Sequence, residues 1–307
     1  MRNLEECVVE GKKKMGFLTV FGSYVLWGLL PGFWTLMAPV NSVYILAQRI
    51  IWSLVFMALY LALTRSLGEV KFAFTDKPTF WRSLASGVFI TVNWGLYIYA
   101  VNSGHVLDAS MGYFIQPVVV ALIGFLVFRE RPTRGEWLTF VFAAAGILYL
   151  LFSTGTVPTL ALAIVIPFAI YGAVKKDLKL TAQTSLFMET LLMTPLALAF
   201  CWWWTAHVGG FANVMGGTAF WLLPACGLVT SIPLLLFNMG VKIIPYYFTG
   251  ILMYINPTLQ FLVGLYMGEP LNQDRFIAFI IIWIGILFTL WDKIKLIRAE
   301  KKNGSLS

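Results

Sequence analysis

Apolar residues fall into ten long stretches that are separated by short polar segments. Each stretch is close to the roughly 20 mostly apolar residues that an α-helix needs to cross the hydrocarbon core of a bilayer. Backbone N–H and C=O groups find no water in that core, so spanning segments of this kind must be helical. The predicted spans are residues 16–36, 43–63, 82–101, 106–128, 135–152, 157–174, 182–204, 218–239, 246–267 and 274–292.

Composition agrees with a chain whose main solvent is lipid. Charged residues make up 12% of the 307 residues and apolar residues 59%, whereas about a quarter of a typical soluble domain is charged. The sequence therefore predicts an all-α polytopic membrane protein. Three cysteines, Cys7, Cys201 and Cys226, lie far apart, so we expect no disulfide framework, no metal site and no cofactor.

The positions of Lys and Arg test both the number of spans and their orientation, because these residues accumulate in cytoplasmic loops. With ten spans and both termini inside, 20 of the 22 basic residues lie in cytoplasmic segments. We therefore expect a multi-pass protein of the cytoplasmic (inner) membrane with cytoplasmic tails at residues 1–15 and 293–307. Orientation in the bilayer explains the net charge of +8, so no nucleic-acid partner is expected.

The chain resembles itself when its second half is shifted back by 140 residues. Pro117 then coincides with Pro257, and Gly124 with Gly264. Each half contains five spans, and an odd number makes the second copy enter the membrane from the opposite side. The sequence thus predicts two inverted five-helix repeats, at residues 16–152 and 153–292, around a central cavity.

Two charged residues lie well inside predicted spans, and they occupy corresponding positions of the two repeats. Arg49 is in the second span and Glu189 in the seventh. A charge in hydrocarbon is costly, so such a residue normally faces a cavity or a partner. In the functional interpretation Glu189 accepts protons and Arg49 binds an anion or sets the local field; the alternative is a structural ion pair, or two groups that are hydrogen-bonded separately.

Other intramembrane polar residues are candidates for contact with a solute. Asn93 and Trp94 lie in the middle of the third span, where packing between helices is an equal alternative. A hydroxyl and an amide precede a proline in both the fourth and the ninth span, and helix interruptions at matching positions of two repeats point to a central site. These residues are Tyr113, Gln116 and Pro117, and Tyr254, Asn256 and Pro257.

Two small-xxx-small faces, at residues 28–32 and 264–268, allow helices to approach closely. Packing within the chain is the first interpretation and a homodimer is the second. Kinks that only shape packing also remain an alternative for both prolines, Pro117 and Pro257.

Inverted repeats around one site are typical of transporters, because two mirror-related halves give two open states of similar energy. We therefore expect a carrier of a small solute that works by alternating access, and not an enzyme. A membrane-embedded enzyme acting on lipid-linked substrates would need paired acids, a metal cluster or a nucleophile with its base, and the sequence offers none of these. A sensor or scaffold is the third hypothesis, and it predicts no solute flux.

Four runs resemble the RarD group, in the EamA branch of the drug/metabolite transporter superfamily. They are Gln48–Ser53, Asn93–Asn102, Asp108–Pro117 and Tyr254–Thr258. The similarity extends over residues 15–292 and implies ten helices around a central cavity, cytoplasmic termini, export of a small metabolite or drug, and an association with chloramphenicol sensitivity. Gln48 departs from the group, which has a His there. That departure removes a titratable neighbour of Arg49.

Overall fold

The regular structure of the chain is helical throughout its described part. A computed structural model describes residues 2–30, 33, 40–102, 106–155, 159–209, 218–266 and 273–304. Its helices are α1 (Arg2–Leu29), α3 (Ser42–Leu63), α4 (Gly68–Thr75), α5 (Lys77–Asn102), α6 (Val106–Leu126), α7 (Arg134–Thr154), α8 (Thr159–Asp177), α9 (Ala182–Val208), α11 (Thr218–Gly240), α12 (Tyr246–Met253), α13 (Ile255–Tyr266) and α14 (Gln273–Gly304).

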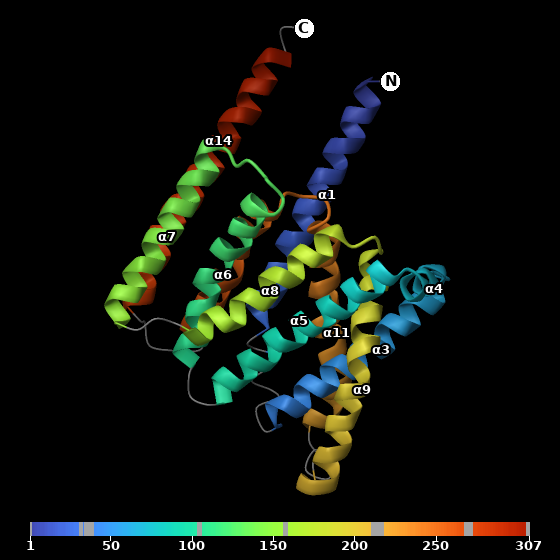
Figure 1. Cartoon of the computed structure of the whole chain (residues 1–307). Coiled ribbons are helices and arrows are strands. Elements are labelled where there is room, and N and C mark those ends of the chain that lie inside the picture. The colour runs from blue at the N-terminus through green and yellow to red at the C-terminus, as the bar shows by residue number, and fades with distance from the viewer. Residues whose placement is uncertain are drawn as a thin grey trace.

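Each of the ten predicted spans coincides with a helix or, for the ninth, with the consecutive helices α12 and α13. Five helical segments within the described residues are long and apolar enough to cross a membrane by length and composition: 43–63, 134–153, 159–177, 182–208 and 220–240. The chain is therefore an all-α polytopic membrane protein. The marked N- and C-terminal ends lie on the same side of the bundle (Figure 1).

Local capping explains where several helices begin and end. The Asn41 side chain accepts hydrogen bonds from two backbone N–H groups at the start of α3, and the Thr181 side chain accepts one, from Thr184, at the start of α9. Thr133 and Glu136 form a reciprocal capping box at the start of α7, and Gly155 ends that helix with a φ of 67°. These side chains satisfy N–H groups that a helix N-terminus leaves without partners, and glycine adopts the left-handed turn without steric cost.

The polar segment 64–81, expected to be a loop, contains the short helix α4 and the start of α5. Glu69 of α4 accepts hydrogen bonds from the backbone N–H and the hydroxyl of Thr181, at 3.0 and 2.7 Å. Burial alone would raise the pKa of this carboxyl, but the hydrogen bonds from Thr181 hold the pKa below its ordinary value. Helix α4 is thus attached to the α8–α9 connection.

The helices pack in pairs that a two-fold repeat predicts. Helix α8 packs on α5 and α6, and its equivalent in the first repeat, α1, packs on their equivalents α11 and α13. In the same way α3 packs on α11, and its equivalent α9 packs on α5. The equivalent helices α3 and α9 also pack on each other, as do α7 and α14, which form a pair at one edge (Figure 1). Helices α3, α5, α9 and α11 therefore form the centre of the molecule.

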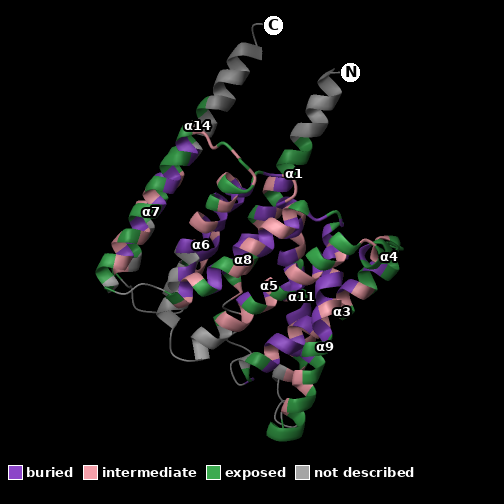
Figure 2. Cartoon of the chain, viewed as in Figure 1, coloured by how far each residue is buried: buried purple, intermediate pink, exposed green. Residues whose placement is uncertain are grey.

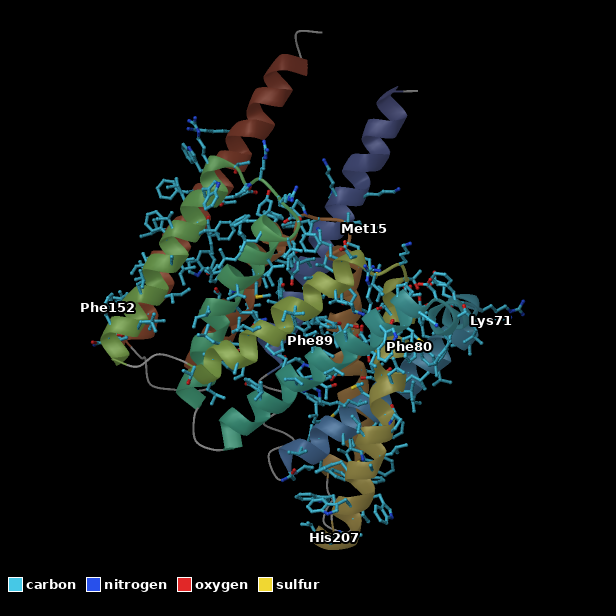
Figure 3. The ribbon with its side chains drawn as sticks, viewed as in Figure 1. Met15, Lys71, Phe80, Phe89, Phe152 and His207 are labelled. Carbon is cyan, nitrogen blue, oxygen red and sulfur yellow. The ribbon has the colours of Figure 1, made fainter. Side chains whose placement is uncertain are left out.

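Burial follows this arrangement. Buried positions concentrate in the central helices, whereas α4, the far end of α9 and the outer face of α7 are exposed (Figure 2). Large apolar side chains point away from the bundle, among them Phe152 at the end of α7, which is 84% exposed (Figure 3). An apolar surface of this extent is unfavourable in water and typical of helices that face lipid.

Candidate functional site

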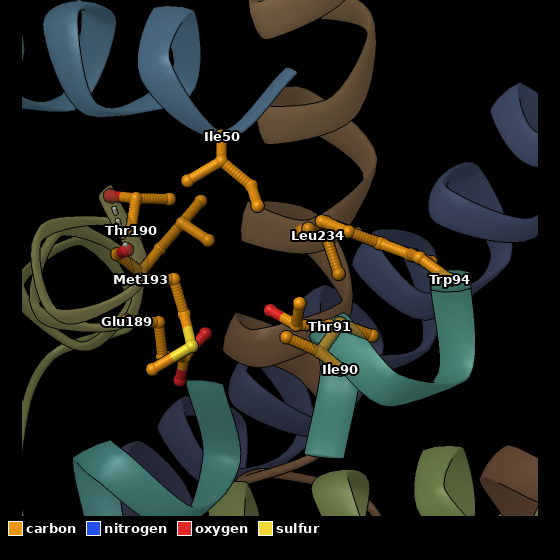
Figure 4. Close-up of a pocket in the computed structure, with 9 residues that line it drawn as sticks. Ile50, Ile90, Thr91, Trp94, Glu189, Thr190, Met193 and Leu234 are labelled. Atoms are coloured by element: carbon orange, nitrogen blue, oxygen red, sulfur yellow. Dashed lines mark hydrogen bonds between the residues drawn. The ribbon is translucent and has the colours of Figure 1, made fainter. Parts of the chain in front are cut away.

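A cavity lies where the four central helices meet (Figure 4). Its volume is about 10 Å³, which is close to the smallest cavity that holds one water molecule. Its lining is mainly apolar and contains one ionisable group, the carboxylate of Glu189. The lining residues are Ile50 of α3, Ile90, Thr91 and Trp94 of α5, Leu186, Glu189, Thr190 and Met193 of α9, and Leu234 of α11.

Glu189 is 2% exposed and its carboxylate is well supplied with donors. Ser86 Oγ of α5 donates to Oε1 at 2.6 Å, and Ser185 Oγ, one turn earlier on α9, donates to the same atom at 3.4 Å. The hydroxyl of Tyr171 lies 3.5 Å from Oε2. Lys175 Nζ of α8 forms an ion pair with Oε1. A buried carboxylate needs such partners because burial removes its hydration.

The predicted sixth span ends at residue 174, so Arg49 and Glu189 were the two charges expected inside spans, whereas the apolar helical segment 159–177 also includes Lys175. Helix α8 continues to Asp177, and Lys175 is fully buried. The physical reason is that the cost of burying the ammonium is offset by an anion on the neighbouring helix. The sequence contains a feature that indicates this burial. Tyr171 and Lys175 are one helical turn apart and share a helix face, as do Ser185 and Glu189, so each charge has a polar neighbour on its own face.

Arg49 is half-buried on α3. Its Nε donates to Thr230 Oγ1 of α11 at 2.8 Å. Its guanidinium carbon lies 4.4 Å from the ring centroid of Trp94, whose ring lines the cavity. A guanidinium over an indole face is a favourable cation–π arrangement, stronger where water is excluded. Arg49 is thus in contact with a residue that lines the cavity.

The surroundings of the two charges are related by the shift of 140 residues. Gly87 of α5 lies against the backbone of Glu189, where a Cβ would be 3.4 Å from its Cα. Gly227 of α11, the residue equivalent to Gly87, lies against α3, where a Cβ would be 2.6 Å from the carbonyl carbon of Trp52. Each charged helix is therefore approached by a glycine of the other predicted half, and small residues are what allow such close approach.

Asn93 makes a contact between helices. Its Nδ2 donates to the carbonyl oxygen of Ile164 in α8 at 2.7 Å. This acceptor lies three residues before Pro167, whose ring and missing N–H disturb the helical hydrogen bonds just before it. The structure therefore gives Asn93 a packing partner, whereas Trp94, its neighbour in the sequence, lines the cavity.

The two proline motifs differ in their local structure. The ninth span divides at Tyr254, three residues before Pro257, and Asn256 accepts a hydrogen bond from Gln260 at 2.8 Å. Helix α6 instead continues through Pro117. The carbonyl oxygen of Pro117 lies 2.6 Å from the place where a Cβ on Gly250 would be, so α6 and α12 approach closely here.

Gln116, Tyr254 and Asn256 are buried. The side chain of Tyr113 lies outside the described residues. The described lining of the cavity includes no residue of either proline motif, so the structure brings together Trp94 and Glu189, with Arg49 beside them, and leaves the proline motifs in neighbouring contacts. Among the described residues, no group of three or more His, Cys, Asp or Glu side chains could hold a metal ion.

Sequence comparisons assign the chain to a family. Residues 14–152 match the EamA-like transporter family. Protein RarD of Streptomyces exfoliatus is 36% identical over 95% of this chain and 93% of its own length, and the uncharacterized transporter YojE of Bacillus subtilis (strain 168) is 37% identical over 94% and 98%. The chain is a RarD-type member of the EamA-like transporter family. As such it is a membrane transporter, and the family match covers the whole of the first predicted repeat.

A solved crystal structure has the same fold as this RarD-type chain. The TM-score is 0.71, with 16% sequence identity, over 90% of this chain and 97% of the other. At this identity the likeness shows the fold alone. The same overall arrangement of helices therefore occurs in a solved structure.

Proposed function

We propose that this protein is a secondary transporter that carries a small solute across the cytoplasmic membrane by alternating access, driven by protons through Glu189. One observation carries the proposal: the cavity lies between helices of both predicted repeats, and it is lined by a buried carboxylate and by the ring of Trp94, against which the guanidinium of Arg49 packs. Ionisable groups inside a membrane are costly and are retained mainly where function needs them.

The predicted inverted repeats support alternating access. Two halves that pack on each other through equivalent helices can exchange roles, so that the same cavity opens to one side and then to the other. The concentration of basic residues in the segments assigned to the cytoplasm supports cytoplasmic termini. The family relationship supports a solute as cargo, and the resemblance to the RarD group makes chloramphenicol one compound to test.

The experiment is uptake into proteoliposomes that contain the purified full-length protein. Amino acids, nucleosides and chloramphenicol are screened with and without a pH gradient. For a compound that is transported, we expect Glu189→Gln to abolish stimulation by the gradient, and Arg49→Ala to reduce uptake on the order of tenfold or more, because a hydrogen bond to a charged group is worth roughly 1.5–3 kcal/mol.

Matched controls are the exposed residues Asp177 and Arg131, as Asp177→Asn and Arg131→Gln. Both should transport at the wild-type rate. If Glu189→Gln retains full stimulation by the gradient, proton coupling at this residue is wrong. If Arg49→Ala folds and transports normally, the role of Arg49 beside the cavity is wrong. No flux of any compound, in protein shown to be folded, would favour a sensor or scaffold.

A further inference from the structure

Lys175 connects two helices that share α5 as a neighbour and differ in the other helices on which they mainly pack. Helix α8, which carries Lys175, packs on α5 and α6, whereas α9, which carries Glu189, packs on α3 and α5. The Lys175–Glu189 ion pair therefore joins α8 to α9 inside the bundle, with 0% and 2% of the two side chains exposed. A relative movement of α8 and α9 would act directly on this pair.

The pair also restricts the chemistry of Glu189. Protonation of the carboxylate while Lys175 remains in contact would leave a buried ammonium without its anion, and the desolvation of such a group is expensive. A carboxylate held in this way cannot serve as a proton carrier until its counter-ion is displaced.

An aromatic ring lies beside the ammonium of Lys175 while it is paired with Glu189. Lys175 Nζ lies 5.4 Å from the ring centroid of Tyr171, one turn earlier on α8. The Tyr171 hydroxyl lies 3.0 Å from Asn238 Oδ1 of α11, which holds the ring in place. This cation–π contact and the ion pair with Glu189 are therefore made by Lys175 at the same time.

Other titratable groups near the pair do not replace Lys175 as the counter-ion. The ammonium of Lys242, after α11, donates to the carbonyl oxygens of Leu178 and Leu180. The remaining titratable groups whose charge acts on Lys242 or Tyr171 are Glu69 of α4 and Tyr246 of α12. Among the described residues, the cation in contact with Glu189 is therefore Lys175.

We propose that Lys175 controls the protonation of Glu189. In the conformation seen here, contact with Lys175 keeps Glu189 ionised. Glu189 takes a proton from water only in a conformation in which the ammonium has moved away from it, and it returns that proton when the contact forms again. This inference rests on the proposed function in one respect only: the proton that Glu189 exchanges is the one that drives transport.

The first test follows the carboxyl group directly and needs no solute. Infrared difference spectra of the reconstituted full-length protein are recorded across neutral pH, and the carboxylic-acid C=O band of Glu189 is identified by its loss in Glu189→Gln. We expect no such band in the wild type. We expect a carboxylic-acid band in Lys175→Met and its loss in the double variant Lys175→Met/Glu189→Gln. Lys175→Arg keeps the positive charge and should show no such band. The exposed Lys179 provides the control, Lys179→Met.

A protonated Glu189 in the wild type at neutral pH would overturn the proposal, and this result does not depend on whether any variant folds. An unchanged carboxylate in folded Lys175→Met would overturn it as well. Because these spectra are independent of transport, they separate a failure of this inference from a failure of the proposed function.

The second test uses the pH dependence of uptake for a compound that is transported. We expect Lys175→Met to shift the pH profile toward higher pH, since Glu189 would then bind its proton more readily, and Lys175→Arg to restore the wild-type profile. A lysine with only a structural role would change the amount of folded protein and leave the profile in place. An unshifted profile in folded Lys175→Met would therefore contradict the proposal.

Discussion

The contact between α11 and α3 allows a sharp comparison between two equivalent glycines. We expect Gly227→Ala to destabilise the protein and Gly87→Ala to leave it at least as stable. A Cβ at position 227 would lie 2.6 Å from the carbonyl carbon and the Cβ of Trp52, and 2.8 Å from the backbone N of Ser53. At position 87 the nearest atoms would be 3.4 Å away, which is ordinary van der Waals contact.

The magnitude follows from these distances. Carbon atoms in good contact are about 3.5–4.0 Å apart, so α3 would have to move by roughly 1 Å to accept Gly227→Ala. Overpacking costs about 1–3 kcal/mol, and the upper end applies where backbone atoms are struck and no rotamer change helps. Alanine favours a helix over glycine by about 1 kcal/mol. The net expectation is a loss of about 2 kcal/mol for Gly227→Ala, and a change between zero and a gain of about 1 kcal/mol for Gly87→Ala.

The assay is reversible unfolding of the full-length protein in mixed micelles by increasing SDS, followed by circular dichroism. Uptake provides a second readout, because a shift of α3 relative to α11 would lengthen the 2.8 Å hydrogen bond from Arg49 to Thr230. Equal stability of the two variants, or a neutral Gly227→Ala, would refute the reasoning from close approach.

Three further predictions concern charged groups. Glu130→Ala removes the acceptor of two N–H groups at the start of α12, so the SDS unfolding free energy should fall by about 1–2 kcal/mol, and Glu130→Gln should lose less. Burial, with repulsion by Lys175, lowers the pKa of Lys242 from 10.5 to about 8. Between pH 8 and 10.5 the unfolded chain therefore binds more protons than the folded chain. The stability of the wild type relative to Lys242→Met should rise over this range and stay constant below pH 8. If thermal unfolding shows the same stability difference between the two proteins at every pH, this prediction is wrong. Lys175→Met should cost up to about 3–5 kcal/mol in the same SDS titration, and adding Glu189→Gln should recover most of it; no recovery would argue against the ion pair.

The positions of the helices could be predicted from the sequence because they depend on local properties. The predicted span 43–63 corresponds to α3 (Ser42–Leu63), and the predicted span 182–204 corresponds to α9 (Ala182–Val208). In hydrocarbon every backbone polar group must be satisfied within its own segment, so a long apolar stretch leaves the chain no choice but a helix. Helix α4 was missed because eight residues between two polar turns carry little periodic signal.

The candidate site was predictable only in part. Arg49 and Glu189 could be found because a charge within an apolar stretch is conspicuous, and Trp94 followed from its depth in the third span. That Trp94 and Glu189 line one cavity with Arg49 beside them is a finding of the structure. Their roles in transport remain predictions that the experiments above test.

The sequence by itself determined the fold class, the approximate positions of the helices and the two charged positions, since each of these depends on residues within one segment. Only the tertiary structure decided which charge pairs with which. A lysine at the end of a span can extend into the headgroup region or turn into the bundle at similar local cost. For Lys175 the presence of the Glu189 carboxylate on a neighbouring helix selects the second, because an ion pair offsets the desolvation of both groups.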